Sequence, residues 1–190
     1  MNKYVFVFDF DLTMTIKNSN GINANSNFIE LFDNENKIIE LKHYLNGIRN
    51  LGHPVYINTR ALVADVKYIL KTIGIDVGPG QLIKEIKGSD TIDYIHNPFS
   101  ISDMIKYDLI NQVKNESLLW AVKKVTYLNK IIDQEKISIE NTLFFDDSLL
   151  NINTAKINGF INSYLVGSDD SGIYGLDYLL IKLDQILSSI

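Results

Sequence analysis

The chain has 190 residues, of which 46% are hydrophobic and 22% charged, and this composition predicts a folded globular protein rather than a disordered chain. Its formal net charge is -5 without a block of lysine or arginine, which argues against a nucleic-acid partner. It has no cysteine, which excludes disulfides, thiolate zinc sites and cysteine nucleophiles. The first apolar run is too short for a membrane span or a signal sequence, so we expect a cytoplasmic protein.

Short apolar runs and stretches of helical period alternate along the chain. Strands that are buried on both faces are predicted at residues 4–8, 55–58, 82–86, 143–145 and 164–166. Apolar stripes between and after these strands predict five helices: Ile38, Leu41, Leu45 and Ile48; Val63, Val66, Ile69, Leu70 and Ile73; Leu118, Val122, Val125, Leu128 and Ile132; Leu149, Ile152 and Ala155; and Leu176, Leu179, Leu180, Leu183 and Leu187.

This alternation is typical of an α/β fold in which helices cover both faces of a sheet. We therefore predict a Rossmann-like three-layer α/β/α sandwich with a mainly parallel sheet, as a single domain over residues 1–190. Two stretches interrupt the pattern. Residues 15–27 are polar and predict a loop or flap after the first strand. Residues 88–115 show no clear period, so they are either a packed irregular connection or a small cap insertion over the site.

Two aspartates follow the first predicted strand directly. Residues two apart in an extended chain point to the same side, so Asp9 and Asp11 are expected to project together from the carboxyl edge of the sheet. Two carboxylates this close repel each other unless a cation or a shared proton offsets the repulsion. The pair therefore predicts a metal site or an acid/base pair, although acids at strand ends also occur in ordinary solvated loops.

A second acidic pair, Asp146 and Asp147, follows the predicted strand at residues 143–145. If this strand and the first are neighbours in a parallel sheet, four carboxylates converge on one crevice. Hard oxygen ligands of this kind suit Mg²⁺, which we predict as the cofactor. The structural alternative for this pair is capping of the helix that follows.

These two pairs resemble motifs of the haloacid dehalogenase superfamily of phosphohydrolases. The first motif of that superfamily matches Asp9-x-Asp11-x-Thr13 at each of its defining positions, and the fourth motif, in its two-aspartate form, matches Asp146-Asp147. The resemblance extends in order over nearly the whole chain. It implies a Mg²⁺-dependent phosphomonoester hydrolase that acts through an aspartyl-phosphate intermediate.

The two middle motifs of the superfamily are single residues. Thr59, which follows the predicted strand at 55–58, matches the second motif, and the resemblance implies that it binds a phosphoryl oxygen. The motif-three lysine falls on Lys123 or Lys124. Lys124 precedes Leu128 by one helical turn, which resembles the spacing in the superfamily, so the resemblance favours Lys124 as the catalytic residue. Arg60 follows Thr59 and could reach a phosphate, so we include it among the substrate-binding residues, with a surface ion pair as the alternative.

The resemblance also implies roles for the acidic residues. Asp9 would attack phosphorus and bind the metal, while Asp11 would act as general acid and base and bind the metal through its main-chain carbonyl. Thr13 would fix the turn that aims Asp11 and contribute to substrate binding. Asp147 would be the direct metal ligand at the end of the fourth motif. Asp146 would be a second ligand or act through water, and Asn151 would orient that shell.

The motifs do not name the substrate. Neither interrupting stretch is long enough for a large cap domain, so we expect an open crevice and a phosphorylated protein as substrate, with phosphotyrosine favoured. The aromatic residues expected to flank a phosphotyrosine ring are Phe10, Tyr94, Phe99 and Tyr107. The first alternative is a phosphatase for small metabolites or nucleotides, and the second is a non-catalytic binding domain that keeps the fold. The sequence does not indicate an oligomeric state.

Overall fold

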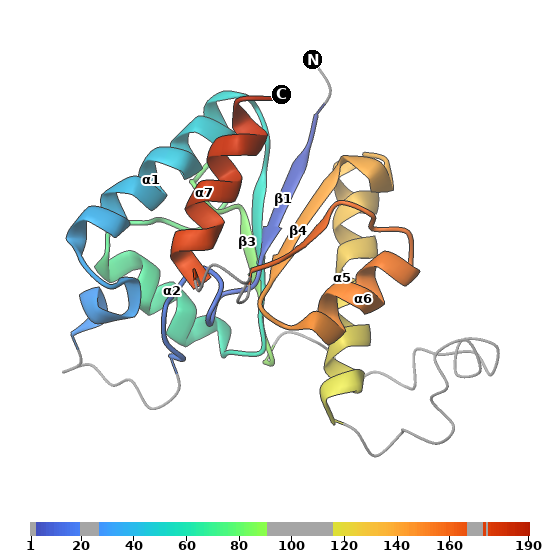
Figure 1. Cartoon of the computed structure of the whole chain (residues 1–190), viewed down its shortest axis with the longest axis horizontal. Helices are drawn as coiled ribbons and strands as arrows, with labels where there is room; N and C mark the ends of the chain where they lie inside the picture. Colours follow the sequence, from blue (N-terminus) through green and yellow to red (C-terminus); the bar gives the residue numbers. More distant parts are fainter. Residues whose placement is uncertain (1–2, 20–26, 91–115, 167–172, 174) are drawn as a thin grey trace.

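A parallel sheet forms the centre of the molecule in the computed structural model, which describes residues 3–19, 27–90, 116–166, 173 and 175–190 (Figure 1). Five strands follow the order β3-β2-β1-β4-β5, and each pair of neighbours is parallel. Their bounds are Val5–Phe8 for β1, Val55–Asn58 for β2, Glu85–Lys87 for β3, Thr142–Asp146 for β4 and Ser163–Leu165 for β5. The prediction of a mainly parallel α/β sheet is confirmed.

The middle strand β1 is buried on both faces, as its unbroken apolar sequence predicts. Because successive side chains of a strand point to opposite faces, Phe6 and Phe8 enter one hydrophobic cluster and Val5 and Val7 enter another. The two clusters lie on opposite faces of the sheet. The molecule therefore has two cores, one on each face of the sheet, as a three-layer sandwich requires.

The first core is closed by three helices, α1 (Glu35–Asn50), α2 (Val63–Thr72) and α7 (Gly175–Leu187), which lie on the left of the sheet in Figure 1. Their buried residues largely repeat the predicted stripes, with Ile186 more deeply buried than Leu187 in the last helix. A short 3-10 helix, η1 (Phe28–Phe32), precedes α1 and adds Phe28, Leu31 and Phe32 to this core.

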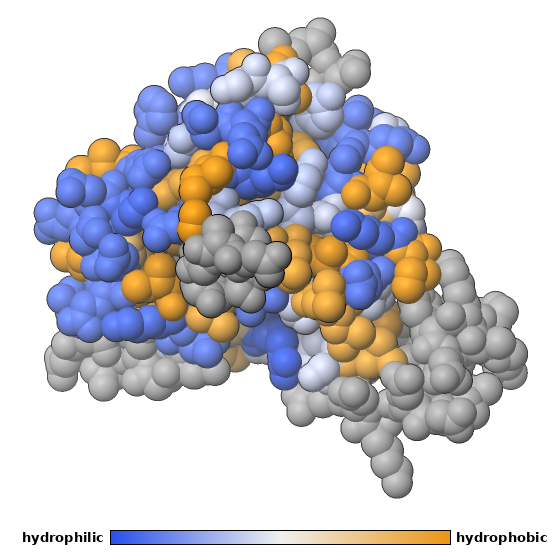
Figure 2. Space-filling model, viewed as in Figure 1, coloured by the Kyte–Doolittle hydropathy of each residue, from blue (hydrophilic) through white to orange (hydrophobic). Residues whose placement is uncertain are grey.

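The second core is closed by α5 (Glu116–Glu135) and α6 (Leu149–Ile157), which pack against each other on the other face (Figure 1). A 3-10 helix, η2 (Ile139–Asn141), leads from α5 into β4. The predicted stripe of α6 is wrong at Leu149, whose side chain is 58% exposed. Its neighbours Asn151, Ile152 and Ala155 are buried instead. Hydrophobic atoms are consequently visible at the surface over α6 in Figure 2.

The third predicted strand, at residues 82–86, begins later than expected. Residues before it close a turn, because the Gly78 N–H donates to the Ile83 carbonyl at 2.9 Å and Val77 pairs with Ile83. Pairing with β2 starts only at Lys84, whose N–H donates to the Val55 carbonyl at 2.8 Å. The regular strand therefore occupies Glu85–Lys87.

Two expectations lie partly outside the described residues. Of the predicted loop at 15–27, residues 20–26 are not described, and of the interrupting stretch at 88–115, residues 91–115 are not described. The single-domain assignment and the possible cap insertion therefore stay predictions. Among the described residues, no helix is both long and apolar enough to cross a lipid bilayer.

Candidate active site

The ends of three neighbouring strands bring the predicted residues together. Phe8 of β1 pairs with Ile57 of β2 and with Phe145 of β4, so these strands end at the same level. The residues that follow are Asp9 after β1, Thr59 after β2 and Asp147 after β4, with Asp146 as the last residue of β4. Ligands of open parallel sheets bind at this carboxyl edge, where the sequence predicted the site.

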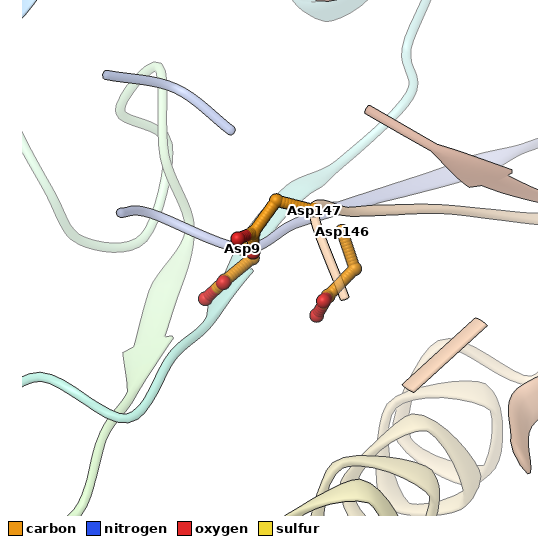
Figure 3. Close-up of side chains that lie close together, drawn as sticks. All are labelled: Asp9, Asp146 and Asp147. Atoms are coloured by element: carbon orange, nitrogen blue, oxygen red, sulfur yellow. The ribbon is translucent and has the colours of Figure 1, made fainter. Parts of the chain in front are cut away.

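An acidic cluster occupies this edge. One carboxylate oxygen from each of Asp9, Asp146 and Asp147 lies within 4.8 Å of the others, and Figure 3 shows the three side chains close together at the ends of β1 and β4. Burial raises the pKa of Asp9 and of Asp147 above the usual value, and repulsion between neighbouring carboxylates adds to both shifts. Only part of this negative charge is compensated by the adjacent Lys124. The donor set therefore fits a hard divalent cation such as Mg²⁺.

Lys124 is the lysine that the structure brings to the cluster. Its side chain is 1% exposed, and its Nζ lies 2.9 Å from Asp9 Oδ1 and 2.6 Å from Asp146 Oδ2. Burial acts to lower the pKa of Lys124, but the charges of Asp146 and Asp9 outweigh it and hold the pKa above its usual value. Lys123 points elsewhere, with its Nζ 4.7 Å from the centre of the Trp120 ring.

Asp146, the last residue of β4, and Asp147, which follows it, have different surroundings. Asp146 is fully buried, and besides Lys124 its carboxylate accepts hydrogen bonds from the Ser148 N–H at 2.9 Å and from Asn151 Nδ2 at 2.7 Å. Burial and the charge of Asp9 raise the pKa of Asp146 to about 6, although Lys124 acts against them. Asp147 lines the cavity above the cluster, whereas Asp146 does not. Asp146 thus contacts Lys124, whereas Asp147 faces the cavity. The expectation that Asp147 is the direct metal ligand and that Asp146 is a second ligand or acts through water stays a prediction.

The cavity at this edge has a volume of about 430 Å³. Its lining residues come from the ends of β1, β2 and β4 and from α5 and α6: Asp9, Asp11, Asn18, Thr59, Arg60, Ala61, Ser117, Trp120, Lys124, Asp147, Ser148 and Asn151. The Asp11 carboxylate is oriented by the Ser19 N–H, which donates to its Oδ1 at 2.7 Å. Thr59 Oγ1 accepts a hydrogen bond from the Ala61 N–H at 3.2 Å, which leaves its hydroxyl hydrogen to serve as a donor.

Thr13, like Asp146, is a predicted site residue that does not line the cavity. Its side chain is fully buried, and its expected roles in the turn and in substrate binding stay predictions. The turn itself is unusual because Leu12 has a φ of 59°, which is costly for a residue with a side chain. Thr15 stabilises it, since its Oγ1 accepts from the Leu12 N–H at 3.1 Å and donates to the Lys17 carbonyl at 2.7 Å.

Several lining residues were not predicted from the sequence. Trp120 and Ser117 precede Lys124 by four and seven residues, so a helical projection from the predicted lysine would have found them. Asn18 lies in the polar stretch after the first strand and carries no signal that distinguishes it from its neighbours. Thr15, four residues after Asp11, likewise gives no sign in the sequence of its role in the turn.

No model of a known protein family matches the sequence, and no curated protein sequence matches it either. Solved structures with the same fold do exist. A 3-deoxy-D-manno-octulosonate 8-phosphate phosphatase from Moraxella catarrhalis, in complex with magnesium, phosphate and KDO, superposes with a TM-score of 0.56 at 14% identity, covering 98% of this chain and 87% of that one.

Two further structures are similar to the same extent. The cobalt-bound deoxy-D-mannose-octulosonate 8-phosphate phosphatase from Haemophilus influenzae has a TM-score of 0.55 at 10% identity, covering 99% of this chain and 88% of that one. A haloacid dehalogenase-like hydrolase from Bacillus subtilis has a TM-score of 0.53 at 12% identity, covering 98% and 89%. The chain therefore has the fold of the haloacid dehalogenase-like hydrolases, which confirms at the level of the fold the resemblance that its motifs indicated.

Proposed function

We propose that this protein is a phosphomonoester hydrolase that depends on a divalent metal ion and uses Asp9 as its nucleophile. The observation that carries the proposal is the position of the Asp9 carboxylate. It lines the cavity at the end of β1, 2.9 Å from the Lys124 ammonium and within the same cluster as Asp147. A carboxylate held beside a fixed positive charge and a metal-binding partner is suited to attack an anionic phosphoryl group, which would otherwise repel it.

The reaction would proceed in two displacements. In the first, an Asp9 oxygen attacks phosphorus, the bond to the ester oxygen breaks, and Asp11 gives its proton to the departing alcohol. In the second, Asp11 takes a proton from a water molecule, the resulting oxygen attacks the aspartyl-phosphate, and inorganic phosphate leaves with Asp9 restored. Asp11 lines the same cavity as Asp9, and the Ser19 N–H fixes its carboxylate.

The remaining residues of the site would hold the phosphoryl group. Lys124 offsets the charge of Asp9 and of the phosphoryl oxygens, and the Thr59 hydroxyl donates to one of those oxygens. The carboxylates of Asp9 and Asp147, with the main-chain carbonyl of Asp11, would hold Mg²⁺, which stabilises negative charge as it develops on the transferring group. The solved structures of similar fold include one with magnesium and one with cobalt, which supports a divalent metal here.

The substrate is better assigned as a small phosphorylated metabolite than as a phosphorylated protein. Two of the similar structures are phosphatases of a sugar-acid phosphate, and a cavity of about 430 Å³ matches a small molecule. The expectation of a phosphotyrosine substrate is not supported. Phe10 is fully buried and cannot flank a substrate ring, while Tyr94, Phe99 and Tyr107 lie outside the described residues.

Hydrolysis of p-nitrophenyl phosphate with and without Mg²⁺ tests the proposal. We expect activity that a chelator abolishes and Mg²⁺ restores, and we expect Asp9→Asn to lower kcat by at least about a thousandfold. Asp133→Asn is the matched control, because Asp133 is an exposed aspartate of α5 remote from the cavity lining. Retention of activity in Asp9→Asn would exclude the aspartyl-phosphate mechanism.

The two lysines provide a second comparison. Lys124→Ala should lower kcat by about two to three orders of magnitude, because it removes a charge that stabilises the transition state. Lys123→Ala should have only a small effect on kcat. The remaining alternative is a binding domain without catalysis. A folded wild-type chain that binds Mg²⁺ but hydrolyses no phosphate ester would favour that alternative.

A further inference from the structure

The direction of the proposed reaction divides the cavity into an inner and an outer part. In an in-line displacement, the leaving oxygen lies opposite the attacking oxygen, with phosphorus between them. The attacking Asp9 lies at the sheet edge beside Lys124. The leaving group must therefore extend away from the sheet, and the residues of the outer part contact the portion of the substrate that differs from one phosphate ester to another.

Helix α5 shows which residues belong to the outer part. Ser117, Trp120 and Lys124 all line the cavity, and their spacing of three and four residues places them on one face of the helix. Trp120 lies one turn, about 6 Å, from Lys124 toward the helix N-terminus. Figure 1 shows that this end of α5 reaches past the carboxyl ends of the strands. Trp120 thus lies where the leaving group must be.

Arg60 brings a positive charge to the same place. It follows Thr59 at the end of β2, it lines the cavity, and its guanidinium carbon lies 5.4 Å from the centre of the Trp120 ring. Contact with an aromatic face favours a defined orientation of the planar guanidinium group. Lys123 also contacts this ring, but it is not among the described residues that line the cavity.

We propose that Arg60, held against Trp120, forms a subsite for a carboxylate on the leaving group, so that the substrates are phosphate monoesters of small hydroxy acids. This inference rests on the proposed phosphatase activity. A guanidinium group binds a carboxylate through two parallel N–H···O hydrogen bonds, a match in shape and charge that a hydroxyl group does not provide. The single charge of Arg60 also suits one carboxylate better than a second, doubly charged phosphate group.

Two pairs of substrates test the subsite, each pair differing only by a carboxylate in place of a hydroxymethyl group. They are 3-phosphoglycerate with glycerol 3-phosphate, and phosphoglycolate with 2-hydroxyethyl phosphate. We expect wild-type kcat/KM to favour the carboxylate in at least one pair by about tenfold or more, as hydrogen bonds to a charged group provide. Arg60→Gln should remove most of that preference, chiefly through KM, and Arg60→Lys should restore part of it because it keeps the charge without the planar fork.

Lys123→Gln is the matched control, because it removes a cation from the same tryptophan without changing the cavity lining, and it should keep the preference. Equal losses on both members of each pair in Arg60→Gln would overturn the inference and place Arg60 at the transferring phosphoryl group. Absence of any wild-type preference in both pairs would also overturn it. Hydrolysis of p-nitrophenyl phosphate tests the proposed function separately. The proposed phosphatase activity would be contradicted only if the wild type hydrolysed no phosphate ester.

Discussion

The same substitution at Asp146, the last residue of β4, and at Asp147, which follows it, should have different effects on stability. In Asp146→Asn, the remaining oxygen can still accept from the Ser148 N–H and from Asn151, but the new amide NH₂ faces the Lys124 ammonium, whose Nζ lies 2.6 Å from the present Oδ2. Two donors then oppose each other, and both side chains are buried. A buried donor that loses its acceptor costs about 1–3 kcal/mol, so we expect Asp146→Asn to lower the free energy of unfolding by that amount.

Asp147 has no comparable set of donors. Asp147 lines the cavity, where water can hydrate an amide in its place. Asp147→Asn should therefore leave the free energy of unfolding unchanged in a chelator. Mg²⁺ bound only by the folded state should stabilise the wild type by about 2.7 kcal/mol at one hundred times its Kd, and Asp147→Asn should lose this gain.

Urea unfolding of the wild type and the two variants measures both effects, once in EDTA and once at saturating Mg²⁺, near pH 7. The expected result is a loss of stability in EDTA for Asp146→Asn alone, and a loss of Mg²⁺-dependent stabilisation for Asp147→Asn. The assignment of the two residues would be refuted if Asp147→Asn destabilised the chelated protein as much as Asp146→Asn does. Unchanged stability of Asp146→Asn would refute it as well.

Two further predictions concern residues outside the cavity. Burial acts to raise the pKa of Glu135, but hydrogen bonds from Lys3, Lys84 and Tyr56 outweigh it and lower the pKa from 4.5 to about 2. The resulting stabilisation is complete above about pH 4.5 and is lost as the pH falls toward 2. Between pH 4.5 and pH 2, the free energy of unfolding should therefore fall more for the wild type than for Glu135→Gln. An equal fall in both proteins would contradict the lowered pKa of Glu135. Gly175→Ala should destabilise the fold by about 1–2 kcal/mol and lower kcat, because Gly175 has a φ of +53° and an added Cβ would lie 3.0 Å from the Thr15 carbonyl oxygen of the active-site turn. Thermal unfolding and turnover of p-nitrophenyl phosphate measure both effects, and a neutral result would show that the turn moves freely.

Most of the fold follows from hydrophobic patterning, because each strand and helix must bury a face that its sequence defines. The five predicted strands and five predicted helices all occur, and the error at Leu149 falls where a local polar contact sets the orientation of the helix. In α6, the Ser148 side chain caps the helix and Asn151 turns inward to bind Asp146, which rotates Leu149 into solvent. Hydrophobic periodicity contains no information about such a hydrogen bond, so the predicted stripe was wrong at that residue.

The candidate site was predictable to the extent that its residues sit at strand ends. Contacts between distant segments were not predictable in the same way. The stacking of Arg60 on Trp120 joins the end of β2 to the start of α5, which are sixty residues apart in sequence, and depends on how the helix lies across the sheet. The network around Glu135 likewise joins the end of α5 to β2 and to the segment before β3. Such contacts arise only once the sheet order β3-β2-β1-β4-β5 is known.

The different positions of Asp146 and Asp147 follow from the alternation of side chains along a strand. Val5 and Val7 of β1 and Phe144 of β4 all face α5 and α6. The same alternation directs Asp9 and Asp146, two residues beyond Val7 and Phe144, toward α5, and there Lys124 lies among the buried residues of that helix and contacts both. Asp147, one residue further, points to the other side and into the cavity. A pair of consecutive aspartates at a strand end therefore places one carboxylate against the lysine and one in the cavity, where we propose that it binds the metal, whereas two aspartates separated by one residue would send both to the same side.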